Sequence, residues 1–423
     1  MTRVSPPLSL RRNFSWTLVG NGVYTACKWV NVLVLVKLAT TQVVGAYALG
    51  LAICAPVMML TDLHLRTIQA TDARREVRFA DYLKLRGLGI ILGISVISAI
   101  ALGLYGASES LPVILGIAVV KGVESLGDVF YGLFQQRERM DRVARSMLLK
   151  AVLGTTLFAA TFAATLRLLP AILALAVCYL AIFAVYDLTG AIRLLREEDA
   201  SSTSSASVGT LNRLRDLVWL ALPMGIVMML NSLYVNVPRY VIERFEGASA
   251  LGIFSALAYI VTLGSLFVGS LGQAVSPRLA RYFASGELVA FRSLMARMLW
   301  IVLAIGAGGV VVAALLGEVL LAHLYSETYA MESELFVWLV IVTALSFFGS
   351  VFGTAVTAMR QFRVQALIQT LNVLLISALS YPLVLRYGLR GAAWAMLLTT
   401  SVMIVMYGVL ARRSLRSAAT VRP

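Results

Sequence analysis

Long apolar segments recur along the whole chain and are separated by short stretches that carry charge. Twelve of these segments reach the length of about 20 residues that a helix needs to cross a bilayer. Hydrophobic residues make up 60% of the sequence and charged residues 13%, against roughly 25% charged in soluble proteins. The pattern predicts an all-α polytopic membrane protein and excludes soluble enzyme folds. The expected spans are 16–38, 46–66, 87–106, 111–134, 147–166, 170–192, 217–239, 250–275, 298–317, 334–358, 364–385 and 391–411.

Lysine and arginine are distributed unevenly over the connections between these spans. Alternate connections, together with both termini, hold 28 of the 36, the opposite connections hold six, and Lys28 and Lys121 lie within spans. Cytoplasmic segments of membrane proteins retain such an excess of basic residues. We therefore expect both termini in the cytoplasm, and we attribute the net charge of +15 to this bias rather than to a nucleic acid partner.

The chain divides into two halves of six spans each. A small, polar stretch within the predicted linker 196–212 separates an N-terminal lobe, 1–195, from a C-terminal lobe, 213–423. At an offset of 207 residues, the segment 44–47 (Val-Gly-Ala-Tyr) aligns with 251–254 (Leu-Gly-Ile-Phe). Six spans per half give both halves the same orientation, which predicts a parallel repeat typical of transporters, with a site between the lobes near the midplane.

Four segments resemble the oligosaccharide flippases of O-antigen and capsule pathways, which belong to the multidrug/oligosaccharidyl-lipid/polysaccharide (MOP) exporter superfamily. They are 13–16, 44–52, 62–73 and 323–330. The most specific part is 65–72, followed by Phe79, Asp81, Tyr82 and Arg86. The resemblance implies a MATE-like, V-shaped pair of six-helix lobes that opens alternately to either face. It also implies a bacterial cytoplasmic (inner) membrane protein that moves polyprenyl-pyrophosphate-linked oligosaccharide units from the inner to the outer leaflet for surface polysaccharide biosynthesis.

This hypothesis implies membrane lipids and other polysaccharide-assembly proteins as further partners, a monomeric state, and no cofactor beyond a coupling cation, H+ or Na+. Two alternatives remain open: a cation-coupled multidrug exporter of the same fold, and a polytopic membrane glycosyltransferase or polymerase. The enzyme is disfavoured because the expected external loop 39–44 holds no ionisable residue and the loop near 318–333 holds no lysine or arginine. We therefore expect no catalytic residue. We also expect no metal site, because the cysteines and histidines form no ligand motif.

The first span carries a polar stripe, and we expect it to line the substrate path. Thr17, Asn21, Tyr24, Lys28 and Asn31 follow one another at steps of four, three, four and three residues, so they share one helical face. An ammonium group in a cleft of low dielectric constant attracts phosphate oxygens strongly. Lys28 is therefore a candidate for pyrophosphate binding, with internal pairing to a carboxylate of another span as the alternative.

The fourth span also places charges on one face. Lys121, Glu124 and Asp128 lie at i, i+3 and i+7. A salt bridge along the helix between Lys121 and Glu124 is one interpretation. The other is that Glu124 or Asp128 couples transport to an ion gradient, with Lys121 as part of the substrate site.

Further candidates lie at the end of the second span and in the second half. We expect Asp62 and Arg66, four residues apart, to form a structural pair, with gating as the alternative. Asn236 and Arg239 share a stripe of the seventh span, where Pro238 predicts a break. Arg239 is expected either to hold an anionic headgroup or to extend to the membrane interface. Tyr259 belongs to a neutral strip suited to sugar hydroxyls or to helix packing.

Overall fold

The computed structural model describes residues 10–72, 77–106, 108–199, 210–359 and 361–421. They form helices and contain no strand. Helices are expected here because a segment in lipid must satisfy its backbone hydrogen bonds internally. The helices are α1 (Leu10–Leu38), α2 (Thr41–Thr61), α3 (Leu65–Thr71), α4 (Phe79–Tyr105), α5 (Ser110–Gln136), α6 (Met140–Thr165), α7 (Leu168–Ile182), the π-helix η1 (Phe183–Leu188), α8 (Thr189–Asp199), α9 (Thr210–Ser285), α10 (Leu288–Leu324), α11 (Glu327–Ala330), α12 (Ser333–Ala358) and α13 (Phe362–Val421).

Nine helices among the described residues are long and apolar enough to cross a membrane. The fold is therefore that of a multi-pass membrane protein, while the count of twelve spans stays a prediction. Two of the longest helices contain a break at a glycine with positive φ, Gly247 (φ 86°) in α9 and Gly388 (φ 58°) in α13. The break predicted at Pro238 is wrong, since α9 continues through it. Membrane helices tolerate proline where neighbouring groups satisfy the freed carbonyl.

The chain folds into two compact units, one of residues 1–34 and 46–232 and the other of residues 35–45 and 233–423. These units differ from the lobes expected from the repeat at two places, 35–45 and 213–232. The start of α9 belongs to the first unit because Leu217 and Ala221 share a buried cluster with Leu63 and Leu65. Residues 196–199 of the predicted linker continue α8, and 200–209 lie outside the described residues.

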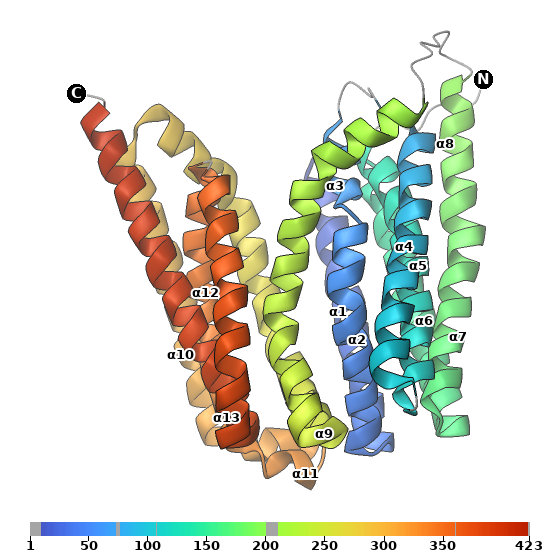
Figure 1. The fold of residues 1–423 in the computed structure, drawn as a ribbon. Coiled ribbons are helices and arrows are strands. Elements are labelled where there is room, and N and C mark those ends of the chain that lie inside the picture. The colour runs from blue at the N-terminus through green and yellow to red at the C-terminus, as the bar shows by residue number, and fades with distance from the viewer. Residues whose placement is uncertain (1–9, 73–76, 107, 200–209, 360, 422–423) are drawn as a thin grey trace. The chain divides into compact units, whose positions relative to one another are not determined.

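In the first unit, α5 occupies the centre. It contacts α3, α4, α6 and α7, and several of these helices run side by side (Figure 1). Every charged side chain that is buried among the described residues belongs to this unit: Asp81, Arg86, Asp141, Lys150 and Asp187. Among the described residues, the buried polar side chains of the first unit therefore include ionic ones, whereas those of the second unit are neutral.

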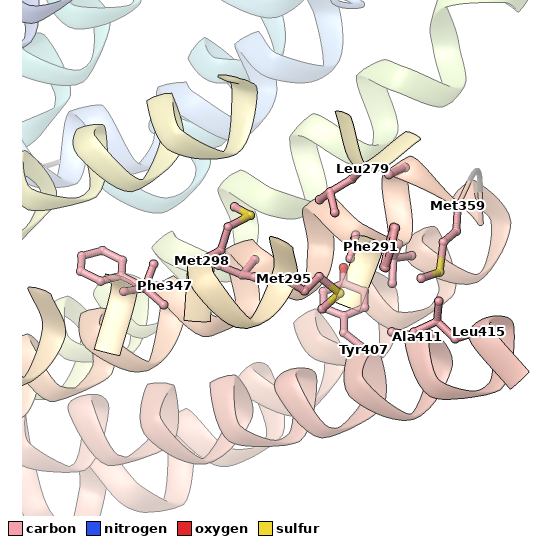
Figure 2. Packing of buried hydrophobic residues seen from close by; sticks show 14 of the residues in the cluster. Leu279, Phe291, Met295, Met298, Phe347, Met359, Tyr407, Ala411 and Leu415 are labelled. Carbon is pink, nitrogen blue, oxygen red and sulfur yellow. The ribbon is translucent and has the colours of Figure 1, made fainter. Parts of the chain in front are cut away.

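The second unit has an apolar core that is rich in methionine. Met295, Met298 and Met359 pack with Phe291 and Phe347 (Figure 2). Methionine fills irregular gaps between helices because its side chain is flexible and unbranched.

Two segments that the sequence repeat relates also meet in the second unit. A β-carbon on Gly45 would overlap the carbonyl oxygen of Ala248, and one on Gly252 would overlap that of Thr41. Thr41 and Ser249 also share a hydrogen bond of 2.5 Å between their hydroxyl oxygens. The close approach of the two backbones therefore requires glycine at both positions. The crossing is symmetric under the 207-residue offset of the sequence repeat, since residue 41 corresponds to residue 248 and residue 45 to residue 252.

Candidate functional site

One carboxylate in the first unit serves two lysines. Lys28 on α1 lies 3.2 Å from Oε1 of Glu124, and Lys121 on α5 lies 2.6 Å from Oε2 of the same residue. The hydroxyl of Tyr24 donates a 2.6 Å hydrogen bond to Oε1, and the Lys28 ammonium lies over the Tyr24 ring, 4.4 Å from its centroid. The structure thus contains both expected pairings, the one along α5 and the one from Lys28 to another span. We call these four residues the lysine cluster.

Asp128 does not join the lysine cluster, although it shares a helical face with Glu124. It contacts Arg66 at 3.2 Å and Arg86 at 3.6 Å. The predicted pair of Asp62 with Arg66 is also absent, because Leu63 and His64 take positive φ values of 50° and 52° and interrupt the helix between them.

Asp62 instead pairs with Arg86 and accepts a hydrogen bond from Ser125. The Arg86 side chain is completely buried, whereas those of Asp62 and Asp128 are 29% and 33% exposed. Arg66 also donates to Gln135 at 3.1 Å. We call Asp62, Arg66, Arg86 and Asp128 the arginine cluster; its guanidinium groups connect the turn after α2 with α3, α4 and α5.

The sequence predicts that Asp187, near the end of the sixth span, caps a helix end or pairs with a basic loop residue, and the structure shows it in an ion pair. Lys150 on α6 lies 2.8 Å from Asp187 in η1 and donates a 2.9 Å hydrogen bond to Tyr131. The expected spans place Lys150 near the start of the fifth span and Arg86 directly before the third, where charge usually marks the end of a span. The signal that was available is their occurrence within segments whose neighbours are apolar, which favours a buried pair over a loop.

The remaining residues of the α1 stripe differ in exposure. Asn21 is exposed and Tyr24 is half-buried. Asn31 is 3% exposed, and its side-chain oxygen has no hydrogen-bond donor among the described residues. The stripe therefore runs from an accessible end at Asn21 to a buried end at Asn31.

In the second unit, Arg239 has no carboxylate within ion-pair distance among the described residues. It donates a 2.8 Å hydrogen bond to Asn236 and lies 5.9 Å from the ring centroid of Tyr259. Its Nε is buried and has no acceptor in the described part of the chain. The structure therefore brings Asn236 and Tyr259 to the guanidinium of Arg239, whose charge is not neutralised by an acid among the described residues.

These arrangements favour anions over cations as ligands. Glu124 is held by two ammonium groups and Asp128 by two guanidinium groups, so neither carboxylate is without a cationic partner. In the described part of the chain, Glu124 is the one acid at ion-pair distance from Lys28, and Lys121 shares it; the Lys28 side chain is 41% exposed. An anion that reaches Lys28 therefore meets an accessible positive charge whose counter-ion is shared.

A sequence profile of the family described as polysaccharide biosynthesis protein matches residues 10–283. The capsular polysaccharide biosynthesis protein CapF of Staphylococcus aureus is 26% identical over 399 residues, which cover 94% of this chain and 98% of that protein.

Solved structures of MATE transporters have a similar fold. A multidrug resistance MATE family transporter of the MOP superfamily, in an inward-facing conformation, aligns with a TM-score of 0.66 and 15% identity over 100% of this chain and 98% of its own. The Vibrio cholerae MATE transporter VcmN aligns with a TM-score of 0.62 and 17% identity over 96% of this chain and 97% of its own. The expected MATE-like fold is thus confirmed.

Proposed function

We propose, on the premise that this chain belongs to the polysaccharide biosynthesis protein family, that it is a flippase for lipid-linked oligosaccharides. Its substrate in this proposal is a polyprenyl-pyrophosphate-linked sugar unit. The protein moves it by alternating access from the inner to the outer leaflet of the bacterial cytoplasmic membrane and is not an enzyme. The single observation that carries the proposal is the lysine cluster, in which Lys28 presents a partly exposed ammonium group inside a membrane helix.

An ammonium group within a membrane span is costly to bury and needs a partner or a function. A diphosphate supplies several anionic oxygens to such a group, and the low dielectric constant of the surroundings strengthens the attraction. Within the second unit, Arg239 with Asn236 and Tyr259 is proposed as a separate contact for a phosphate group, since guanidinium groups match phosphate geometry. Asn21 and Asn31 are proposed to bind sugar or phosphate oxygens along the stripe.

The multidrug exporter of the same fold is less well supported by these contacts. A cationic drug needs an acid that is not already neutralised, whereas Glu124 and Asp128 are each held by two cations. In our proposal a proton or sodium gradient supplies the energy. Glu124 and Asp128 are the acids proposed to respond to it, in a stage of the transport cycle in which a ligand or a helix movement has taken away one of their two cationic partners. Asp62 and Arg66 belong to the proposed gate.

The proposal is tested by complementation of a bacterial strain that lacks its own flippase. We expect the wild-type chain to restore surface polysaccharide, Lys28→Ala to abolish it at an unchanged protein level, and Lys28→Arg to retain part of it. Normal export by Lys28→Ala would assign this residue to a dispensable structural role.

The proposed orientation has a separate test. Reporter fusions after residue 205 and at the C-terminus should report cytoplasm, and a fusion near residue 325 should report the outside, because basic residues are retained on the cytoplasmic side. An external signal at residue 205 would contradict the model of six spans in each half.

A further inference from the structure

The Glu124 carboxylate already occupies the position at which an anion would contact Lys28. Its two oxygens are used differently. Oε2 faces Lys121 at 2.6 Å, whereas Oε1 receives the Tyr24 hydroxyl at 2.6 Å and faces Lys28 at the longer distance of 3.2 Å. The contact between Lys28 and Glu124 is therefore the longest of the three that hold this carboxylate.

The pair that includes Lys28 also differs from the other in its place in the fold. Lys121 and Glu124 lie three residues apart on α5, so their contact is local to one helix. Lys28 lies on α1, and its side chain is 41% exposed, against 22% for Lys121 and 18% for Glu124. The contact to Lys28 is consequently the one that an incoming ligand can replace without disturbing α5.

We propose that Glu124 is an internal place-holder for the anionic group of the substrate. In the empty protein its carboxylate neutralises Lys28. When a diphosphate binds, a phosphate oxygen replaces the Glu124 carboxylate as the ion-pair partner of Lys28. Glu124 keeps its contacts to Lys121 and Tyr24. This inference rests on the proposed function and adds to it the residue that limits the affinity of the anion site.

The exchange has a physical advantage over an open ammonium group. Leaving one member of a buried ion pair without its partner is costly, so a site that swaps one anion for another avoids an unpaired charge in either state. Because the ligand must displace a carboxylate, it binds less tightly than it would to a vacant ammonium group. A transported ligand has to leave as well as enter, so binding must remain weak enough for release.

A simpler explanation is that Glu124 weakens anion binding only through its negative charge. The two explanations differ for the double variant Lys121→Gln/Glu124→Gln, which has the same net charge as the wild type but leaves Lys28 without a competing carboxylate. An effect of net charge alone predicts wild-type affinity for it. The place-holder predicts tighter binding.

The experiment measures binding of inorganic pyrophosphate to purified protein in nanodiscs by titration calorimetry at fixed ionic strength. We expect Glu124→Gln and the double variant both to bind more tightly than the wild type, by roughly tenfold for the double variant, and Lys28→Gln to lose binding. Lys37→Gln is the matched control, because Lys37 is at the end of the same helix, contacts the His323 carbonyl and lies outside the cluster; its affinity should equal that of the wild type.

Thermal melting of each variant shows whether it is folded. If Glu124→Gln unfolds, the double variant replaces it in the binding experiment. The double variant removes both members of the Lys121–Glu124 pair and so leaves no unpaired charge at position 121. Equal affinity of the double variant and the wild type, with binding lost in Lys28→Gln, would overturn the place-holder and leave the proposed anion site standing. Absence of pyrophosphate binding in every form, the Glu124 variants included, would overturn the anion site of the proposed function and the place-holder with it.

Discussion

Replacement of Arg86 by methionine tests whether the arginine cluster holds the first unit together. The guanidinium is completely buried between Asp62 and Asp128 and also donates to Ser125 at 3.1 Å. Methionine retains much of the apolar volume but leaves Asp62 without its cation, whereas Asp128 keeps Arg66. Breaking a buried pair costs about 3–5 kcal/mol. Because both carboxylates are about a third exposed, we expect the lower end, about 3 kcal/mol.

The assay is thermal melting of the purified protein in detergent. A loss of about 3 kcal/mol corresponds to a decrease in Tm of roughly 6–12 °C for a unit of this size. Lys84→Met is the matched control, since Lys84 is exposed on the same helix, and surface substitutions usually stay within about 0.5 kcal/mol. Addition of Asp62→Asn to Arg86→Met should recover part of the loss, because it removes the stranded charge. An Arg86→Met variant that melts with the Lys84→Met control would refute this reasoning.

Three further predictions concern other parts of the chain. Gly45→Ala should destabilise the folded protein by about 1–3 kcal/mol through overpacking, which lowers Tm and the yield of monodisperse protein. Gly22→Ala should leave both unchanged, because the space around its β-carbon is open. Equal melting temperatures of the two variants would contradict the backbone crossing. The single variant Lys150→Met should have a lower Tm than the double variant Lys150→Met/Asp187→Leu, since the double variant leaves no unpaired buried charge. A lower Tm of the double variant would refute the role of Lys150 as the ionic partner of Asp187. Burial raises the pKa of Tyr329 to about 12, so the folded state keeps its proton at a pH at which the unfolded state, with a pKa of about 10, has lost it. The free energy of unfolding should then decrease as the pH rises between these two pKa values. Melting curves at alkaline pH should show a smaller decrease for Tyr329→Phe than for the wild type. Identical pH dependence of the two proteins would contradict the prediction.

The fold could be predicted from the sequence to a large extent because apolar length and the bias of basic residues are one-dimensional signals. The pairing of charges could not, since it depends on which helices are neighbours. Lys28 and Glu124 are separated by nearly a hundred residues and meet only because α1 lies beside α5. Asp62 and Arg66 have helical spacing but different partners, because Leu63 and His64 interrupt the helix.

Direct translocation by the purified protein tests the central claim most closely. Proteoliposomes would contain a polyprenyl-pyrophosphate-linked oligosaccharide in the inner leaflet, and lectin binding from outside would report its arrival in the outer leaflet. A matched lipid carries the same sugar on a polyprenol without phosphate. We predict that the wild-type protein moves the diphosphate lipid, that Lys28→Ala does not, and that the uncharged lipid is not moved by either. Equal translocation of the two lipids by the wild type, or undiminished translocation of the diphosphate lipid by Lys28→Ala, would contradict recognition of the anionic group by the lysine cluster.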